Sequence, residues 1–184
     1  MHSLWLQTIE RGLIMKCARC NSQTVGKSKY CRTHRAEARK RWKSMISEKS
    51  AERNARYTAF SEALESGRLK AQMAAKAAVP VPMVVQEHEN MLDDGSPIVK
   101  QWHHSEGVCG FAWVRVLPGN SSFARWAVKR KLATSHYRGG ITLQAGYHGQ
   151  SLERAEAYTR ALAKSLRTDL ASYNLRIYSQ SRID

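Results

Sequence analysis

The most informative stretch of this chain is Lys16-Cys-Ala-Arg-Cys20, followed after ten residues by Cys31-Arg-Thr-His34. A tight turn through Cys17 and Cys20 directs two thiolates at one point, and Cys31 and His34 are spaced so that a helix brings them to the same point. All four corners of a tetrahedron are then protein side chains, which leaves no position for a substrate or an activated water. The sequence therefore predicts that Cys17, Cys20, Cys31 and His34 bind one structural Zn2+ that stabilises a small folded segment.

Two other interpretations of these cysteines are a disulfide or redox pair and unlinked thiols that happen to be close. Three of the four cysteines lie within 15 residues, beside a histidine at ligand spacing. The first residues also lack a secretory signal, and together these features favour a metal site over a disulfide framework. Cys109 lies far away in an apolar run, where we expect a small core residue.

The segment from Cys17 to about Trp42 resembles a treble-clef finger, which consists of a knuckle, a short hairpin and a helix whose first turn carries the second ligand pair. The resemblance implies zinc but no particular function, because members of this family bind DNA, RNA or protein and some support nuclease sites. No His-Asn-His set accompanies the finger here.

A long basic helix is expected after the finger, over residues 33–78, because Ala, Glu, Lys and Arg dominate and no Pro or Gly occurs before Gly67. The net charge of the chain is +15, and residues 16–57 hold 13 basic and 3 acidic side chains. Such an excess is typical of proteins with a polyanionic partner, so DNA or RNA is the expected ligand. The predicted contacts on this helix are Arg32, Arg35, Arg39, Lys40 and Lys43. The alternative is a solvated helix face.

The composition divides the chain into a finger (residues 15–43), the helical region (33–78), a Pro-containing acidic linker (79–107) and an α+β domain (108–184). The part of the helical region after Gly67 is expected to be a spacer, and Val79-Pro-Val-Pro82 is expected to end the helix and mark the domain boundary. Residues 1–14 have two interpretations. They are either upstream sequence read through before a natural start at Met15, or a short amphipathic arm.

The C-terminal domain is expected to run strand, helix, strand, strand, helix, strand, and this order resembles the ferredoxin-like (βαββαβ) arrangement. The expected strands are 108–117, 133–137, 141–145 and 175–179, and the expected helices are 122–132 and 151–170. Together with the finger, this predicts an α+β fold.

The strand at 108–117 alternates between two faces. If its small and branched side lies under the helices, Phe111, Trp113 and Arg115 project from the open face as a base-stacking platform. The alternative is that Phe111 and Trp113 are core residues. Arg125 and Lys129, on the following helix, are either phosphate contacts or solvated side chains.

The C-terminal half also resembles small uncharacterised proteins of tailed phages, in Gly110-Phe-Ala-Trp-Val114, Phe123-Ala-Arg-Trp126 and Ser181-Arg-Ile-Asp184. This resemblance implies a phage origin, and hence the cytoplasm of a bacterial host or the virion. No run of about 18 apolar residues exists, so we expect no membrane partner.

Three functions remain open at this point. The leading one is a non-enzymatic nucleic-acid-binding protein. The second is a phage protein-interaction module that docks on a host factor or belongs to the virion. The third is a metal-dependent nuclease that uses His103 or His104, although no carboxylate motif accompanies the histidines His103, His104, His136 and His148.

Overall fold

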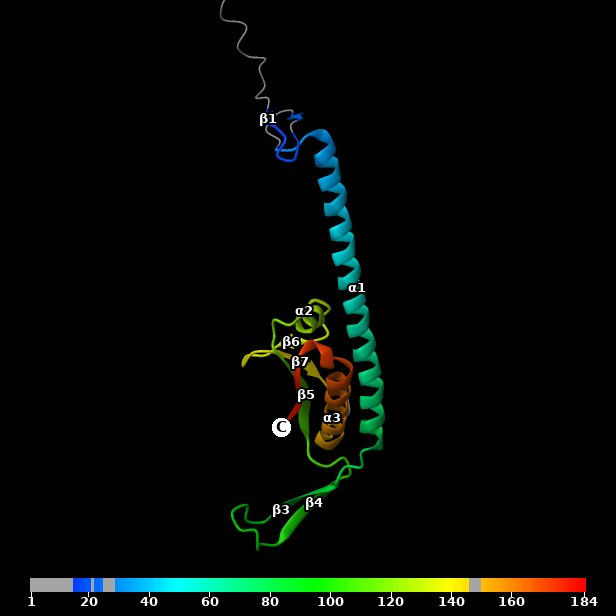
Figure 1. Ribbon diagram of the computed structural model, residues 1–184. Helices are drawn as coiled ribbons and strands as arrows, with labels where there is room; N and C mark the ends of the chain where they lie inside the picture. The colour runs from blue at the N-terminus through cyan, green and yellow to red at the C-terminus, as the bar shows by residue number, and fades with distance from the viewer. Residues whose placement is uncertain (1–14, 21, 25–28, 146–149) are drawn as a thin grey trace, which may run out of the picture. The chain divides into compact units, whose positions relative to one another are not determined.

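The computed structural model describes residues 15–20, 22–24, 29–145 and 150–184, so both hypotheses about residues 1–14 lie outside the described residues, as does His148. The chain forms two compact units, Met1–Ala55 and Arg56–Asp184. The helix α1 (Arg32–Ala77) contributes to both of them (Figure 1). No helix in the described part of the chain is long and apolar enough to cross a membrane.

In the first unit, two short strands precede α1. Strand β1 (Met15–Lys16) pairs antiparallel with β2 (Gln23–Thr24). Cys17 follows β1 directly, and α1 begins at the residue after Cys31. From Arg32 to Ala55, all side chains of α1 are exposed except those of His34 and Ser50, which are half-buried.

The second unit is built on a four-stranded antiparallel sheet with the strand order β6-β7-β5-β8. The strands are β5 (Gly110–Leu117), β6 (Thr134–Ser135), β7 (Ile141–Gln144) and β8 (Arg176–Ile183), and the helices between them are α2 (Ser122–Lys129) and α3 (Leu152–Asp169). A 3-10 turn, Ala171–Tyr173, follows α3. The order of elements from β5 to β8 is the one predicted from the sequence.

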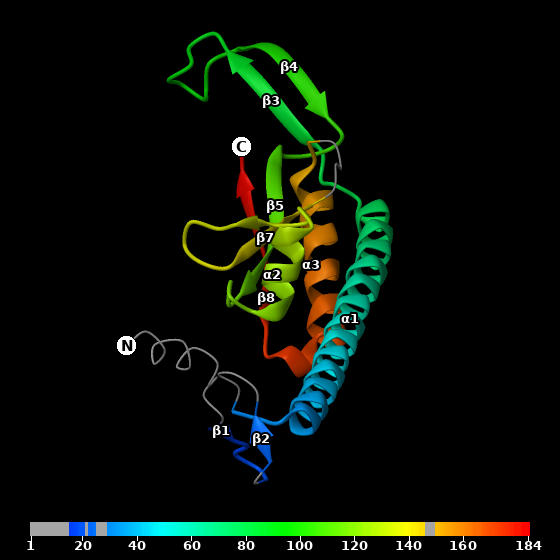
Figure 2. The ribbon, with the colours of Figure 1, turned by 90° about the horizontal axis from the view of Figure 1, so that it is seen from above.

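The helices cover one face of this sheet, and α3 lies between the sheet and the C-terminal half of α1 (Figure 2). Ala112, Val114 and Val116 of β5 point to this side and are at most 4% exposed. These small and branched side chains let α3 approach the sheet closely, so the first part of the two-face prediction for β5 is correct.

The C-terminal half of α1 packs into the core of the second unit. Phe60 is fully buried, and its ring lies 5.4 Å from that of Phe123, 5.6 Å from that of Trp126 and 4.9 Å from that of Tyr173, measured between centroids. Farther along the helix, a Cβ added at Gly67 would meet Leu162 of α3 at 2.9 Å.

Two expectations about α1 are therefore wrong. The helix continues through Gly67 without a break. The residues after Gly67 are not a spacer, because Ala71 and Ala75 are buried in the same core as Phe60. The boundary between the compact units lies between Ala55 and Arg56 rather than at residues 79–82. The buried apolar side chains of α1 pack against elements much later in the chain.

The expected acidic linker forms a β-hairpin. Strand β3 (Met83–His88) pairs antiparallel with β4 (Ile98–His104), with a bulge between Glu87 and His88. The hairpin extends beyond the end of the sheet (Figure 1), and every residue of β4 is exposed. At its base, the backbone N–H of Val81 donates to Glu153 at 2.7 Å, which ties the hairpin to the beginning of α3.

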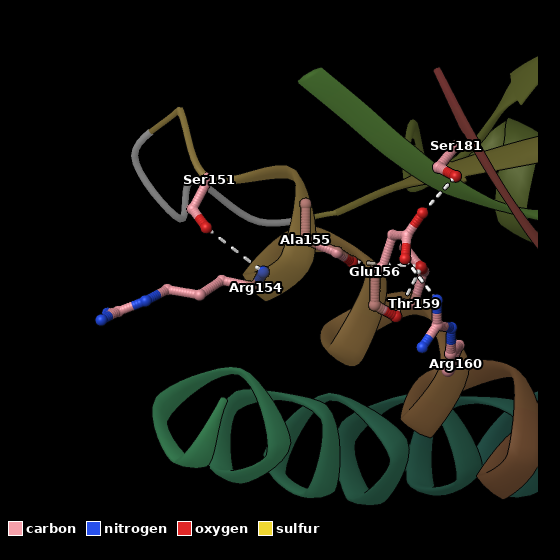
Figure 3. A network of polar contacts seen from close by, with 7 residues as sticks. All are labelled: Ser151, Arg154, Ala155, Glu156, Thr159, Arg160 and Ser181. Carbon is pink, nitrogen blue, oxygen red and sulfur yellow. Dashed lines mark hydrogen bonds and ion pairs between the residues drawn. The ribbon is translucent and has the colours of Figure 1, made fainter. Parts of the chain in front are cut away.

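A network of polar contacts fixes α3 on the edge strand β8 (Figure 3). The hydroxyl of Ser151 accepts from the backbone N–H of Arg154 and caps α3. One turn further, Glu156 accepts a hydrogen bond of 2.6 Å from Ser181 of β8 and forms an ion pair with Arg160. The side chain of Ser181 is thereby held on the helix side of the sheet.

Candidate functional site

The four predicted metal ligands lie together in the first unit. Cys17 and Cys20 are in the loop between β1 and β2, Cys31 is the last residue before α1, and His34 is in its first turn. Their ligand atoms all lie within 4.8 Å of one another, and Cys17 and Cys31 are buried. The ladder between β1 and β2 closes the loop that carries Cys17 and Cys20. The beginning of α1 then places Cys31 and His34 beside this first pair.

Three of the separations between these atoms are close to the edges of a metal tetrahedron. The Nδ1 atom of His34 is 3.3 Å from the sulfur of Cys17 and 3.5 Å from that of Cys31. The sulfurs of Cys20 and Cys31 are 3.7 Å apart. With metal–sulfur bonds of about 2.3 Å and metal–nitrogen bonds of about 2.0 Å, a tetrahedral site has edges of roughly 3.5 to 3.8 Å. The four residues can therefore hold one metal ion.

The local environment favours thiolates at two of the three cysteines. Burial raises the pKa of Cys17, but hydrogen bonds from backbone N–H groups, of which that of Cys31 is the strongest, and from His34 outweigh it and bring the pKa to about 5. The hydroxyl and the backbone N–H of Ser22 lower the pKa of Cys20. A metal binds the thiolate and not the thiol, so these two positions are prepared for it.

The other two ligands hold protons more tightly. The backbone N–H of His34 lowers the pKa of Cys31, but burial and the nearby thiols Cys20 and Cys17 outweigh it, so the net shift is upward. The pKa of His34 is raised, chiefly by its hydrogen bond with Cys17. A cation at the centre of the cluster would displace protons from Cys31 and His34.

The predicted basic contacts on α1 are all exposed. Arg32, Arg35, Arg39, Lys40 and Lys43 lie within the first dozen residues of the helix, immediately after the metal cluster. In the described part of the chain, the salt bridges join Arg154 to Glu106 and Arg160 to Glu156, and neither involves this segment. The charges of these five side chains are therefore presented to solvent.

The platform residues of β5 lie on the side of the sheet opposite the helices of the described residues. Phe111 is 52% exposed and Trp113 is half-buried. Arg115 is different, because it is only 8% exposed and its guanidinium donates to the backbone carbonyls of Arg138 and Gly139. Arg115 fixes the turn between β6 and β7 and is not presented as a phosphate contact.

The contribution of β8 to this surface was not predicted from the sequence. The residues that lie beside Phe111, Trp113 and Arg115 on β8 are Arg182, Gln180 and Tyr178. The guanidinium of Arg182 lies 5.9 Å from the ring centroid of Phe111. The alternation Arg176, Tyr178, Gln180, Arg182 is visible in the sequence, but the expected strand ended at Ser179. We call the surface formed by Phe111, Trp113, Gln144, Tyr178, Gln180 and Arg182 the open sheet face.

The remaining candidates are scattered. Arg125 and Lys129 are exposed on α2, and His103 and His104 are exposed on β4, where His103 contacts Gln101 at 2.9 Å. Cys109 is half-buried, and its thiol donates to Gln150 at 3.4 Å. Among the described residues, no second group of three or more Cys, His, Asp or Glu side chains is close enough to hold a metal.

Comparison with known proteins adds no assignment, since no protein-family model, curated protein or solved structure matches this chain.

Proposed function

We propose that this protein is a non-enzymatic nucleic-acid-binding protein, in which a treble-clef-type finger that binds one structural Zn2+ fixes the beginning of a basic helix for contact with backbone phosphate. The observation that carries the proposal is the row of exposed cations on the turns of α1 that follow the metal cluster, outside the salt bridges of the described residues. A polyanion would neutralise them and release condensed counterions, which is the main source of affinity in such complexes.

Zinc is the best candidate for the ion because three sulfurs and one imidazole nitrogen form a soft, tetrahedral donor set. The ion would have no open position, so its contribution is to folding rather than to chemistry. Few apolar side chains among the described residues of this segment are buried, and a structural metal can supply the stability that a core would otherwise provide.

We also propose that the segment from β5 to β8 has the ferredoxin-like arrangement. Two observations support this: the element order strand, helix, strand, strand, helix, strand, and the sheet order β6-β7-β5-β8 with antiparallel neighbours. Interleaving two split βαβ units gives this strand order.

The test of the proposed function is binding of fluorescent DNA duplex, single-stranded DNA and RNA by the full chain over a series of salt concentrations. If six to ten phosphates are contacted, affinity for duplex falls by about three to five decades between 50 and 200 mM salt. Replacing Arg39, Lys40 and Lys43 together by Gln should weaken binding and reduce the salt slope by about 0.9 for each phosphate that is no longer neutralised.

The matched control replaces three exposed lysines of the second unit, Lys76, Lys100 and Lys164, by Gln, which removes the same charge. We expect this control to bind nearly as the unmodified protein does. Equal losses of affinity in both variants would mean that net charge alone acts. No binding of any probe at low salt would refute the proposal.

A second candidate function is docking on a protein of the host or the virion, and the hairpin favours it. Val84, Val85, Ile98, Val99 and Trp102 are 39 to 59% exposed there. An isolated two-stranded hairpin is only marginally stable in water, so a partner surface would stabilise it. Capture of one defined protein from nuclease-treated lysate, abolished in a variant with Val85 and Trp102 replaced by Ser, would support this function.

A further inference from the structure

The open sheet face combines aromatic side chains with positive charge. Phe111 and Trp113 of β5 lie two residues apart on the same side of the strand, which separates them by about 7 Å. Arg182 lies beside Phe111, and Tyr178 lies farther along β8. The described strand residues on this side also include Arg176 at the other end of β8, and they include no carboxylate.

Hydrogen bonds hold these side chains in place. The indole N–H of Trp113 donates to Gln180 at 3.1 Å, which fixes the ring against the neighbouring strand. Ser181 is held on the opposite side of the sheet by Glu156 (Figure 3), so its neighbour Arg182 must point to the open side. At the other end of this face, the guanidinium carbon of Arg115 lies 5.9 Å from the ring centroid of Tyr178. The same guanidinium donates to the backbone carbonyls of Arg138 and Gly139 and so holds the β6–β7 turn.

This chemistry suits one kind of ligand. Aromatic rings at a sheet surface bind the π-faces of unstacked bases, and arginines beside them bind phosphate. In a duplex the base faces are covered by their neighbours, so a stacking surface selects single strands. The described strand residues on this side include the cations Arg176 and Arg182 and no carboxylate, and the one described acidic residue beside them is Asp184, directly after β8. This balance favours a polyanion over a basic peptide.

We propose that the open sheet face binds single-stranded nucleic acid, with bases stacked on Phe111 and Trp113 and phosphate contacted by Arg182. This goes beyond the proposed function, because it requires neither the metal cluster nor α1. Strand β7 contributes Gln144 to this face rather than a third ring, since its apolar residues Ile141 and Leu143 point into the core. The surface therefore offers two stacking positions on β5 and a polar side on β7.

The experiment uses the full chain and three labelled probes: a 12-nucleotide oligothymidylate, the matching oligouridylate and a 12-base-pair DNA duplex. Phe111→Ala should lower affinity for the single strands by about 5- to 100-fold and leave duplex affinity unchanged. Phe111→Trp restores a π-face and should keep single-strand binding. Comparison of the two single-stranded probes distinguishes DNA from RNA as the source of the bases.

The matched control is Tyr137→Ala, which removes an exposed aromatic side chain that lies outside the open sheet face. It should bind every probe as the unmodified protein does. Because Phe111 is half exposed, Phe111→Ala should leave the melting temperature nearly unchanged. Arg182→Gln is a second variant, which keeps both rings and removes only the proposed phosphate contact. Substituting bromouracil into the single strand and irradiating it should produce a crosslink to Phe111 or Trp113.

Several outcomes would overturn the inference. One is equal single-strand affinity in Phe111→Ala and the unmodified protein, and another is a dimer in solution that Phe111→Ala disrupts, which would assign the face to a second copy of the chain. If Phe111→Ala has no effect while the Arg39, Lys40 and Lys43 variant no longer binds, the proposed function stands and this inference falls. The reverse pattern would sustain this inference alone.

Discussion

At the residue scale, the turn between β6 and β7 depends on two consecutive glycines. Gly139 and Gly140 both have φ = +82°, a conformation that other residues adopt at a cost. Their surroundings differ, because a Cβ added at Gly139 would meet nothing within 4 Å, whereas one added at Gly140 would lie 2.6 Å from the backbone carbonyl oxygen of Val116.

The two glycines should therefore respond differently to substitution. We expect Gly139→Ala to destabilise the protein by about 1 to 2 kcal/mol, the cost of a left-handed backbone. Gly140→Ala should cost clearly more, because the turn must also move away from β5. Urea unfolding of both variants checks this prediction, and equal losses of stability would contradict it.

The ionisation of the metal ligands sets the pH dependence of metal binding. With the pKa of Cys17 at about 5, this thiol is already ionised at neutral pH. The pKa of Cys31 is raised above the ordinary value of a thiol, so Cys31 keeps its proton at neutral pH, and this proton must leave when an ion binds. The pKa of His34 is also raised, chiefly by its hydrogen bond with Cys17. Affinity should therefore fall as the pH is lowered.

We expect zinc binding at pH 7 to release at least about one proton, and apparent affinity to fall about tenfold per pH unit for each proton released. Calorimetric titration in two buffers with different ionisation enthalpies measures this number. An apparent binding enthalpy that is the same in both buffers would show that no proton leaves and would contradict the assignment of raised pKa values.

The sequence identified the candidate metal ligands because ligand chemistry restricts both residue type and spacing. It could not do the same for Arg115. An arginine that alternates with aromatic residues on a strand suggests a surface cation, but the carbonyls that it binds belong to a turn 23 and 24 residues later. That contact depends on how the β6–β7 turn folds back, which local sequence does not encode.

At the element scale, α1 consists of an exposed segment followed by a buried one. Up to Ala55 its side chains are almost all exposed, whereas Phe60, Leu64, Ala71 and Ala75 are at most 3% exposed. The helix stays continuous because Ala, Glu, Lys and Arg predominate along it and no Pro interrupts it.

Phe60→Ala should therefore destabilise the second unit by about 3 to 5 kcal/mol, as expected for removal of a buried aromatic ring. Met73→Ala, on the same helix but 71% exposed, should change stability by no more than about 0.5 kcal/mol. Thermal unfolding followed by circular dichroism compares the two variants. Similar melting temperatures for both would contradict the packing of α1 in this core.

The elements of the C-terminal half could be predicted because β5, α2 and α3 have clear periodicity and capping serines. The hairpin could not, because both of its strands are exposed and so lack the alternation that marks a half-buried strand. The burial of the second half of α1 was also missed, because its partners lie far away in the sequence.

At the scale of the whole molecule, the two compact units have different sources of stability. Among its described residues, the first has few buried apolar side chains and a candidate metal cluster, whereas the second has a continuous core. Replacement of Cys20 by Ala should therefore lower the stability of the first unit and leave the melting of the second unchanged. Two variants that keep only one tryptophan, with the others replaced by Phe, report on the units separately: Trp42 on the first unit and Trp126 on the second. A melting transition that shifts equally in both variants would contradict this prediction.

The most direct test of the account is the metal content of the purified full chain, measured by mass spectrometry together with binding to duplex DNA. We predict about one zinc per chain, removed together with DNA affinity in a double variant with Cys20 and Cys31 replaced by Ala. A full chain that contains no zinc, takes none up, and binds DNA equally well with a strong chelator present would contradict the central claim.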